Sequence, residues 1–241
     1  MSGLSAPRGA LARAGRALLL AVAALAVAAL SWVLWIAAQV GWYRYYPPGE
    51  TAFMAERMAE ARAKNPNAAL RYRWVPYARI SVNLKRAMVA AEDAKFVDHS
   101  GFDWDGIQSA LEKNRRKGQI VAGGSTITQQ LAKNLFLSPA RSYWRKGAEA
   151  VITVLLEAML PKRRILELYL NVIEWGNGVF GAEAAAKRYF GVSAAELSAE
   201  QAARLAAMTP SPRLFERRGD SAYLAGRTST ILARMPSAVV P

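Results

Sequence analysis

Hydrophobic positions recur with the period of an α-helix through most of the chain after residue 50. In segment 81–96, apolar residues fall at i, i+3, i+4 and i+7, the spacing of one helix face. That first stripe consists of Leu84, Ala87, Met88 and Ala91. Three similar stripes follow along the chain: Ile127, Leu131 and Leu135, then Val151, Ile152, Leu155 and Met159, and finally Ile165, Leu168, Tyr169 and Val172. The exception is 67–82, where residues 70–75 alternate like a short strand. The pattern predicts a mainly α-helical domain.

Residues that begin or end helices support this division of the chain. Pro161 suits the first turn of the helix that follows it. Capping boxes are predicted where a Ser or Thr is followed three residues later by Glu or Gln, at 126–129, 193–196 and 198–201. Gly191 is placed to end the preceding helix.

The segment 17–40 has a different pattern, because it is apolar on all sides. Its 24 residues carry no charge, which is long enough to cross a bilayer as a helix. Aromatic residues gather at its C-terminal end, namely Trp32, Trp35, Trp42, Tyr43, Tyr45 and Tyr46. Three arginines precede it and only Arg44 follows closely. The positive-inside rule therefore predicts that residues 1–16 stay in the cytoplasm and that the remainder is exported.

A cleaved signal peptide is the alternative interpretation of this segment. Its apolar region would be shorter and would end at a small-residue cleavage site, whereas this one is long and ends in tryptophans. An uncleaved anchor is therefore favoured. Pro47, Pro48 and Gly49 then break the helix, and 41–77 is expected to be a linker and membrane-proximal region.

Composition narrows the possible chemistry. The chain has no cysteine, which excludes disulfides, thiolate metal sites and a thiol nucleophile, and its single histidine excludes a His-rich metal site. The net charge is +14, of which Arg8, Arg13, Arg16 and Arg44 contribute +4 before residue 50. The remaining excess of +10 calls for an anionic partner such as a phosphorylated substrate, lipid headgroups or nucleic acid.

The stretch EDAKFVDHSG, residues 92–101, places Glu92 on the same helix face as Leu84 and Met88. A carboxylate on an apolar stripe is expected to be partly desolvated, which makes it a better proton acceptor. Asp93 is turned about 100° away. On this stretch alone, a solvated helix end is the favoured interpretation.

A second segment, GGSTITQQLAKN at 123–134, combines a helix N-terminus with hydroxyls, amides and Lys133. Thr126, Gln129, Gln130 and Lys133 share a face opposite the apolar stripe, and such a face is suited to an anionic or polar ligand. The alternative is a capped surface helix. The scarcity of charged residues on this face favours a binding role, but the P-loop ending Gly-Lys-Ser/Thr is missing.

Two further segments are basic. In RSYWRKGAE at 141–149, Arg141, Arg145 and Lys146 begin a helix, where the helix dipole disfavours cations, which points to an anionic ligand. The alternative is an i,i+4 ion pair at the surface, which explains Arg145 with Glu149 but does not explain Arg141 and Lys146. In KRRILELYLN at 162–171, a core helix with a charged start is the favoured interpretation.

Taken together, these four motifs resemble the family 51 glycosyltransferases, the peptidoglycan glycosyltransferases that polymerise lipid II. The resemblance covers about 78–213 and includes Gly176 and GAEAAAKRYFG at 181–191. No Ser-x-x-Lys or Lys-Thr-Gly of a transpeptidase domain is present, so the chain is similar to the monofunctional biosynthetic transglycosylases. The resemblance implies a lysozyme-like, mainly α fold with a small membrane-proximal lobe, a catalytic domain over 78–213 and a C-terminal tail over 214–241.

The resemblance also assigns roles to residues. It implies that Glu92 is the general base on the acceptor 4-hydroxyl and that Glu149 is the second catalytic-site glutamate. The diphosphate-binding residues would be Lys133, Arg141, Arg145 and Lys146. Polar residues lining the cleft would be Ser125, Thr126, Gln130 and Asn134. The residues supporting the first motif would be Asp93, Phe96 and His99.

The implied substrates are lipid II and a growing glycan strand on undecaprenyl diphosphate. Release of that diphosphate is compatible with Mg²⁺ or Mn²⁺, although no dedicated cage is evident in the sequence; no organic cofactor is expected. The resemblance places the protein in the bacterial inner membrane with a periplasmic catalytic domain. Partners would be the membrane and cell-wall synthesis or division proteins, and export argues against nucleic acid.

Two other functions share some of these features. A lysozyme-like lytic enzyme would have the fold and the acid but would not need four basic residues at a diphosphate. A non-enzymatic membrane scaffold would use only the basic surface. Between the first two motifs, the polar and basic segment 102–122 is expected to be a loop that is mobile without substrate.

Overall fold

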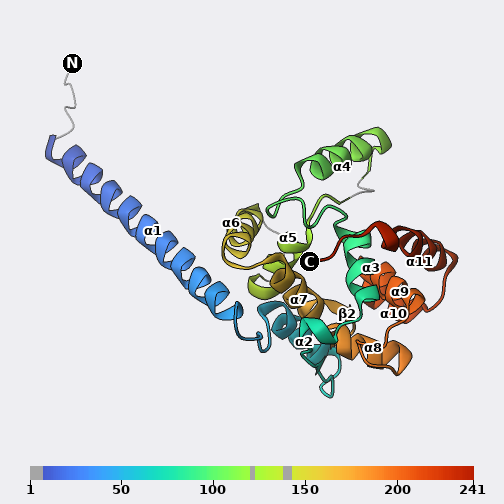
Figure 1. The fold of residues 1–241 in the computed structure, drawn as a ribbon. Coiled ribbons are helices and arrows are strands. Elements are labelled where there is room, and N and C mark those ends of the chain that lie inside the picture. Colours follow the sequence, from blue (N-terminus) through green and yellow to red (C-terminus); the bar gives the residue numbers. More distant parts are fainter. Residues whose placement is uncertain (1–7, 120–122, 138–142) are drawn as a thin grey trace.

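The N-terminal apolar segment forms one long helix that extends away from the rest of the molecule (Figure 1). The computed structural model describes residues 8–119, 123–137 and 143–241. Helix α1 (Arg8–Tyr43) contains the predicted segment 17–40, and its stretch Ala12–Tyr43 is long and apolar enough to cross a membrane. Leu19 and Leu25 are 69% and 70% exposed, which is unfavourable in water and suits a lipid environment.

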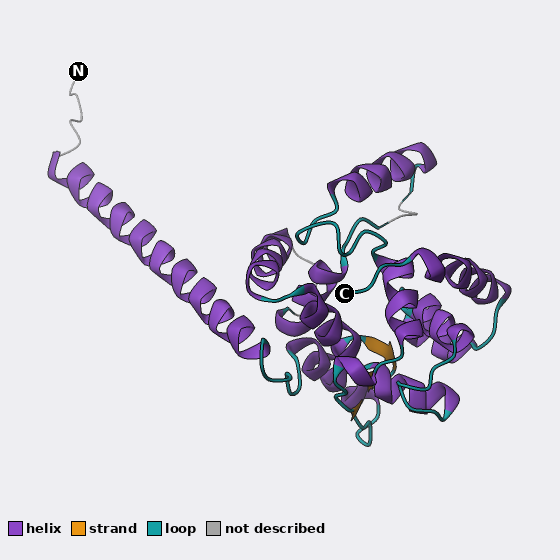
Figure 2. Ribbon diagram, viewed as in Figure 1, coloured by secondary structure: helices purple, strands orange, loops and turns teal. Residues whose placement is uncertain are grey.

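The remainder of the described chain is mainly helical, as the periodicity predicts (Figure 2). The helices are α2 (Ala52–Lys64), α3 (Val82–Glu92), α4 (Trp104–Lys117), α5 (Ile127–Phe136), α6 (Tyr143–Met159), α7 (Lys162–Val172), α8 (Ala182–Phe190), α9 (Ala199–Met208), α10 (Pro212–Arg218) and α11 (Ala222–Arg234). Short 3-10 turns cover Tyr77–Arg79 and Met235–Ser237. A small sheet has the order β1 (Arg71–Tyr72), β3 (Val179–Phe180), β2 (Glu174–Gly176), with β1 parallel and β2 antiparallel to β3. The strand predicted within 70–75 is thus confirmed.

Helix α7 lies in the centre of the core. Its predicted stripe is fully buried, and Tyr169 on it is among the largest side chains with no exposed surface. Helix α5 packs against both α6 and α7, and α3 packs against α9. Burial of such apolar stripes contributes roughly 25 cal/mol per Å² of apolar surface, so this packing is what holds the helix ends in place.

The polar residues Glu167 and Asn171 of α7 also have structural roles. Asn171 accepts a hydrogen bond from the N–H of Val75 and donates to its carbonyl, both over 2.9 Å. Glu167 accepts the N–H of Tyr77 over 2.7 Å. The predicted core-helix interpretation of 162–171 is therefore confirmed.

Two of the three predicted capping boxes are present. The side chains of Thr126 and Gln129 cap α5 reciprocally, and Ser198 and Gln201 do the same for α9. Gly191 ends α8 in the left-handed conformation. The box predicted at 193–196 is wrong, because those residues close a turn in which both the N–H and the hydroxyl of Ser193 donate to Glu196.

The structure corrects two boundaries. The helix predicted over 81–96 ends at Glu92, because the Asp93 carboxylate accepts the N–H of Ile127 and the backbone leaves the helical conformation. The segment 102–122, predicted to be a loop, contains α4 over 104–117. This helix projects from the domain (Figure 1). Of its apolar residues only Ala110 is buried, while Trp104 and Leu111 are exposed.

The last helices pack onto the domain rather than extending from it. Helix α11 lies against α9 and α3, and it buries Leu224 and Ile231. The 3-10 turn after it contacts α3 and buries Met235. The segment 214–241, expected to be a tail, therefore contributes to the core beside α3.

The membrane helix is fixed to the domain at its C-terminal end. Ile36 and Val40 are buried, and α1 lies against α6. Arg164 donates from Nε to the carbonyl of Tyr43 over 2.7 Å and from Nη2 to that of Tyr46 over 2.8 Å. A cation at the C-terminal end of a helix is favoured by the helix dipole.

Candidate active site

Glu92 is the last residue of α3, and three other parts of the chain hold its carboxylate. Gln130 on α5 donates from Nε2 to Oε2 over 2.9 Å, and the hydroxyl of Thr209 donates to Oε1 over 2.6 Å. Arg227 on α11 has its Nη2 3.8 Å from Oε1. The side chain is 15% exposed, so the carboxylate is partly desolvated, as its position on the Leu84/Met88 face predicts. A carboxylate fixed at both oxygens has a defined orientation.

The amide of Gln130 is itself oriented. Its Oε1 accepts a hydrogen bond from the hydroxyl of Tyr169 over 3.0 Å, which leaves Nε2 to face Glu92. Complete burial raises the pKa of Tyr169, so its hydroxyl stays a donor. Asn134 donates to the carbonyl of Gln130 over 2.7 Å and supports the same turn of α5.

Asp93 and His99 join the first motif to the second. Asp93 Oδ2 accepts the N–H of Ile127 over 2.9 Å, and Oδ1 lies 2.9 Å from His99 Nε2. The other nitrogen of His99, Nδ1, accepts the N–H of Gly101 over 3.1 Å. Nδ1 therefore carries a lone pair, and Nε2 carries the hydrogen that it donates to Asp93. The hydroxyl of Thr126 completes the link by donating to the carbonyl of Gly101 over 2.7 Å.

The three predicted supporting residues, Asp93, Phe96 and His99, occupy structural positions. Burial raises the pKa of Asp93, while the hydrogen bonds from His99 and Ile127 oppose that shift. Phe96 is fully buried, with the ammonium of Lys162 4.5 Å from its ring centre. The arrangement fixes the end of α3 against the start of α5, and so fixes Glu92 beside Gln130.

A cavity of about 170 Å³ lies on the side of Glu92 where Gln130 and Thr209 meet. It is lined by Phe53, Arg57, Gln130, Lys133, Asn134, Tyr169, Ile173, Glu174, Thr209, Pro210 and Pro212. Burial lowers the pKa of Lys133, and the charge of Glu149 acts in the opposite direction. Within the described part of the chain the Lys133 ammonium has no hydrogen bond or ion pair, and it lies 5.9 Å from the ring centre of Phe53. A half-buried, unpaired cation of this kind is suited to an anionic ligand.

Glu149 is buried rather than at the surface, so the surface-pair interpretation of Arg145 and Glu149 is wrong. Its exposure is 4%, because α6 packs against α5 over it. Lys146 is hydrogen-bonded to it, and Nη1 of Arg145 lies 3.6 Å from Oε2. Nε of Arg145 is buried without a hydrogen bond in the described structure. Basic groups thus gather around one buried carboxylate near Lys133.

The structure brings most of the predicted site residues together. Gln130 and Lys133 line the cavity, and Glu92 is hydrogen-bonded to Gln130. Arg145, Lys146 and Glu149 lie on the neighbouring helix, and Thr126 and Asn134 support α5 from within. Ser125 is exposed just before α5. Arg141 lies outside the described residues.

Sequence analysis missed Thr209 and Arg227, which approach Glu92 from the C-terminal part of the chain. Neither belongs to a motif with periodic spacing. The one available indication is that Thr209 follows α9 directly and precedes Pro210, so it lies at a helix end where a side chain can turn inward.

The arrangement does not form a protein cage for a divalent cation. Over residues 8–119, 123–137 and 143–241, no three His, Asp or Glu side chains are grouped so that they could hold a metal ion. The oxygens of Glu92 are engaged by Gln130 and Thr209, and those of Glu149 by Arg145 and Lys146. The donor set does not fit a resident Mg²⁺ or Mn²⁺.

Comparison with known proteins identifies the family. The sequence profile described as Transglycosylase matches residues 59–236. A biosynthetic peptidoglycan transglycosylase of Dechloromonas aromatica (strain RCB) is 62% identical over 212 residues, which is 88% of this chain and 92% of that protein. Proteins of the same description from Azoarcus sp. (strain BH72) and Aromatoleum aromaticum are 60% and 56% identical, over 94% and 96% of this chain and 96% and 99% of theirs. The chain therefore belongs to the transglycosylase family and is a glycosyltransferase.

Proposed function

We propose that this chain is a peptidoglycan glycosyltransferase that polymerises lipid II into glycan strands and releases undecaprenyl diphosphate. The observation that carries the proposal is the juxtaposition of a fixed carboxylate and an unpaired, half-buried cation. Glu92 is held by Gln130 and Thr209, and Lys133 lines the cavity between them. A reaction that removes a proton at one point and develops negative charge at another needs both groups.

Glu92 is the general base in this mechanism. The sugar hydroxyl of the acceptor lipid II transfers its proton to a Glu92 oxygen while its oxygen forms a bond to the anomeric carbon of the donor strand. The bond from that carbon to the diphosphate oxygen breaks, and its electron pair leaves with the undecaprenyl diphosphate. Attack on the face opposite the leaving group inverts the anomeric centre, as in an inverting glycosidase with a sugar hydroxyl in place of water.

The basic residues stabilise the leaving group. Lys133, Arg145 and Lys146 provide cations that are positioned before the reaction, so the developing phosphate charge needs little reorganisation. We assign the same role to Arg141, because it belongs to the same basic segment, 141–149. Glu149 holds Arg145 and Lys146 at the start of α6, and its role is to orient these cations.

The anchor fits a lipid-linked substrate. Arg13 and Arg16 lie at the N-terminal end of α1, so the positive-inside rule puts that end in the cytoplasm and the catalytic domain on the periplasmic side. There the domain meets lipid II at the inner membrane surface, beside other proteins of cell-wall synthesis or division.

Incubation of the full-length protein with lipid II in detergent tests the proposal. Wild-type protein should convert lipid II to polymer, and Glu92→Gln should abolish polymerisation while leaving the melting temperature and vesicle association unchanged. Shortening of finished glycan with no polymer from lipid II would instead identify a lytic enzyme. Unchanged polymerisation by Glu92→Gln would remove Glu92 from the mechanism.

A further inference from the structure

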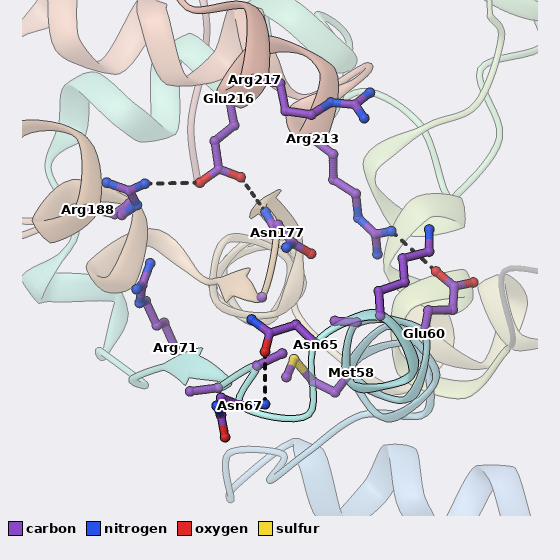
Figure 3. Close-up of a pocket in the computed structure, with 15 residues that line it drawn as sticks. Met58, Glu60, Asn65, Asn67, Arg71, Asn177, Arg188, Arg213, Glu216 and Arg217 are labelled. Carbon is purple, nitrogen blue, oxygen red and sulfur yellow. Dashed lines mark hydrogen bonds and ion pairs between the residues drawn. The ribbon is translucent and has the colours of Figure 1, made fainter.

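A second, larger cavity of about 740 Å³ opens between the end of α2, the start of β1, and helices α8 and α10 (Figure 3). Neither Glu92 nor any side chain that holds it lines this cavity. Five cationic side chains face two carboxylates; these are Lys64, Arg71, Arg188, Arg213 and Arg217 against Glu60 and Glu216. The cavity therefore has an excess positive charge that the mechanism above does not use.

Two of the cations are held in place by carboxylates. Arg188 Nη2 lies 3.5 Å from Oε1 of Glu216, whose Oε2 accepts the N–H of Asn177 over 2.6 Å (Figure 3). Arg213 Nη1 lies 3.3 Å from Glu60 Oε2. These ion pairs use up both carboxylates that line the cavity.

The other three cations have no partner. The side chains of Lys64, Arg71 and Arg217 make no ion pair or hydrogen bond within the described part of the chain, and all three are exposed to solvent at the cavity. Arg71 reaches from β1 toward Arg188 (Figure 3). Like charges gathered in one concave surface raise its potential and attract a ligand that carries several negative charges.

Only one layer of side chains separates this cavity from the cavity beside Glu92. Glu60 and Arg213 line the larger cavity, whereas Arg57 and Glu174 line the smaller one. The four form a single ion-pair network, in which Arg213 Nε lies 2.5 Å from Glu174 and Arg57 Nη1 lies 2.9 Å from Glu60. The two cavities therefore lie on opposite sides of one ion-pair network, close enough for a single branched substrate to be considered for both.

We propose that the larger cavity binds the carboxylates of the peptide branch that peptidoglycan sugars carry. This inference rests on the proposed function and adds a substrate-recognition site to it. Lys64, Arg71 and Arg217 have no negatively charged partner, and the carboxylates of a peptide supply several negative charges. Helices α8 and α10 lie on the side of the domain away from α1 (Figure 1), which favours a peptide over a phospholipid headgroup.

Direct binding tests the site without any catalytic step. The probe is a fluorescent copy of the peptide branch with free carboxylates, compared with the same peptide amidated at every carboxylate. Fluorescence anisotropy with full-length protein in detergent should show tighter binding of the free peptide. The Arg71→Gln/Arg217→Gln variant should bind it about tenfold more weakly, the size expected for two exposed charge pairs.

The matched control removes two neighbouring charges outside the cavity. Arg73 and Arg218 are exposed and adjacent in sequence to the cavity arginines, but neither lines the cavity. Arg73→Gln/Arg218→Gln should bind the free peptide as the wild type does. Equal affinity for free and amidated peptides, or equal loss in both double variants, would overturn the proposal. The proposal would also be overturned if Arg71→Gln/Arg217→Gln lost binding to anionic phospholipid vesicles but still bound the peptide, because a lipid headgroup would then be the ligand.

Kinetics provide the second measurement. With lipid II carrying free or amidated peptide, wild type should show a lower KM for the free form, and the ratio of the two KM values should fall toward one in Arg71→Gln/Arg217→Gln. A ratio unchanged by the variant would overturn the site. Absence of any polymer with wild-type protein would refute the proposed function alone, since the binding measurement with peptide does not depend on it.

Discussion

Thr209 and Glu92 are 117 residues apart in sequence, yet the hydroxyl of Thr209 donates to Oε1 of Glu92 over 2.6 Å. The same hydroxyl lies 2.8 Å from the carbonyl oxygen of Ala206. A hydroxyl has one hydrogen, so it serves these two acceptors in turn. It donates to Glu92 when that residue is a carboxylate. In the proposed mechanism Glu92 takes up a proton, and the hydroxyl can then turn to Ala206 and accept the new hydrogen bond.

Replacing Thr209 by valine should therefore slow the reaction without changing the shape of the side chain. Loss of one hydrogen bond to a charged group predicts a fall in kcat/KM of about tenfold or more in a lipid II polymerisation assay. Thr209→Ser, which keeps the hydroxyl, should stay close to wild type. Thr230→Val is the matched control, since Thr230 also bonds to a carbonyl one turn earlier but is exposed. A valine variant as fast as wild type would show that the contact has no part in catalysis.

The half-buried position of Lys133 predicts an effect at alkaline pH. Because burial lowers the pKa of this ammonium below its ordinary 10.5, its charge is lost at a lower pH than that of a surface lysine. The kcat/KM profile, which reports the free enzyme, should therefore decline on an alkaline limb below pH 10.5. Lys133→Arg should move that limb upward, because guanidinium stays charged.

The exposed Lys187 provides the control for this titration. Lys187→Arg should leave the alkaline limb where it is in the wild type. An alkaline limb at the same pH in Lys133→Arg would assign the titration to another group.

Gly101 occupies a position that excludes a larger residue. Its φ is +92°, and an added Cβ would lie 2.7 Å from Cγ2 of Thr153 and 3.0 Å from Cγ of Glu157. Gly101→Ala should lower the free energy of unfolding by about 2–4 kcal/mol, the sum of backbone strain and overpacking. Denaturant titration of the full-length protein in detergent measures it.

Two further variants separate strain from crowding at this position. Gly118→Ala should cost only about 1 kcal/mol, because Gly118 has φ +62° but open space around it. Adding Thr153→Ser to Gly101→Ala removes the crowding methyl group and should recover part of the loss. No recovery in the double variant would place the whole cost in the backbone.

Asp93 makes the stability of the fold depend on pH. Its pKa in the folded state is raised above the ordinary 3.8, so the contribution of this residue is greatest below pH 3.8 and is lost as the pH rises through the raised value. Because Asn does not titrate, the melting temperature of wild type minus that of Asp93→Asn should fall as the pH increases from 3.5 to 6. His99 and Lys162 face Asp93 and oppose this effect.

Asp98→Asn, at an exposed position, is the comparison for this measurement. Its difference from wild type should not follow the same course. A difference for Asp93→Asn that grows with pH would mean that the attraction of His99 and Lys162 outweighs burial.

The site was predictable where an apolar stripe carries a polar residue at its end. Leu84 and Met88 are both fully buried, and Glu92 continues their face, so spacing made Glu92 a candidate. Spacing alone still favoured a solvated helix end, and the family resemblance was needed to choose between the two. Thr209 could not be found in this way. Its partner is far away in sequence, and a single polar residue after a helix has no period from which its direction can be inferred.

Other misses have different physical reasons. The spacing of Arg145 and Glu149 predicts that they meet, but only the packing of α6 on α5 determines that Glu149 is buried. Helix α4 has apolar residues at helical spacing, Trp104, Ile107 and Leu111, but the polar and basic residues around 112–118 favoured a loop. Its ends did contain usable information, because Asp103 caps the first turn and Gly118 ends the last in the left-handed conformation.

Helix α7 connects the membrane helix to the surroundings of Glu92. Arg164 near its start binds the final carbonyls of α1, and Tyr169 one turn further on holds Gln130 against the Glu92 carboxylate. Hydrogen bonds therefore link the end of α1, through α7, to the residue that orients Glu92. Under the proposed function, this link fixes the height of Glu92 above the bilayer surface, and a tilt of α1 would move the cleft with it.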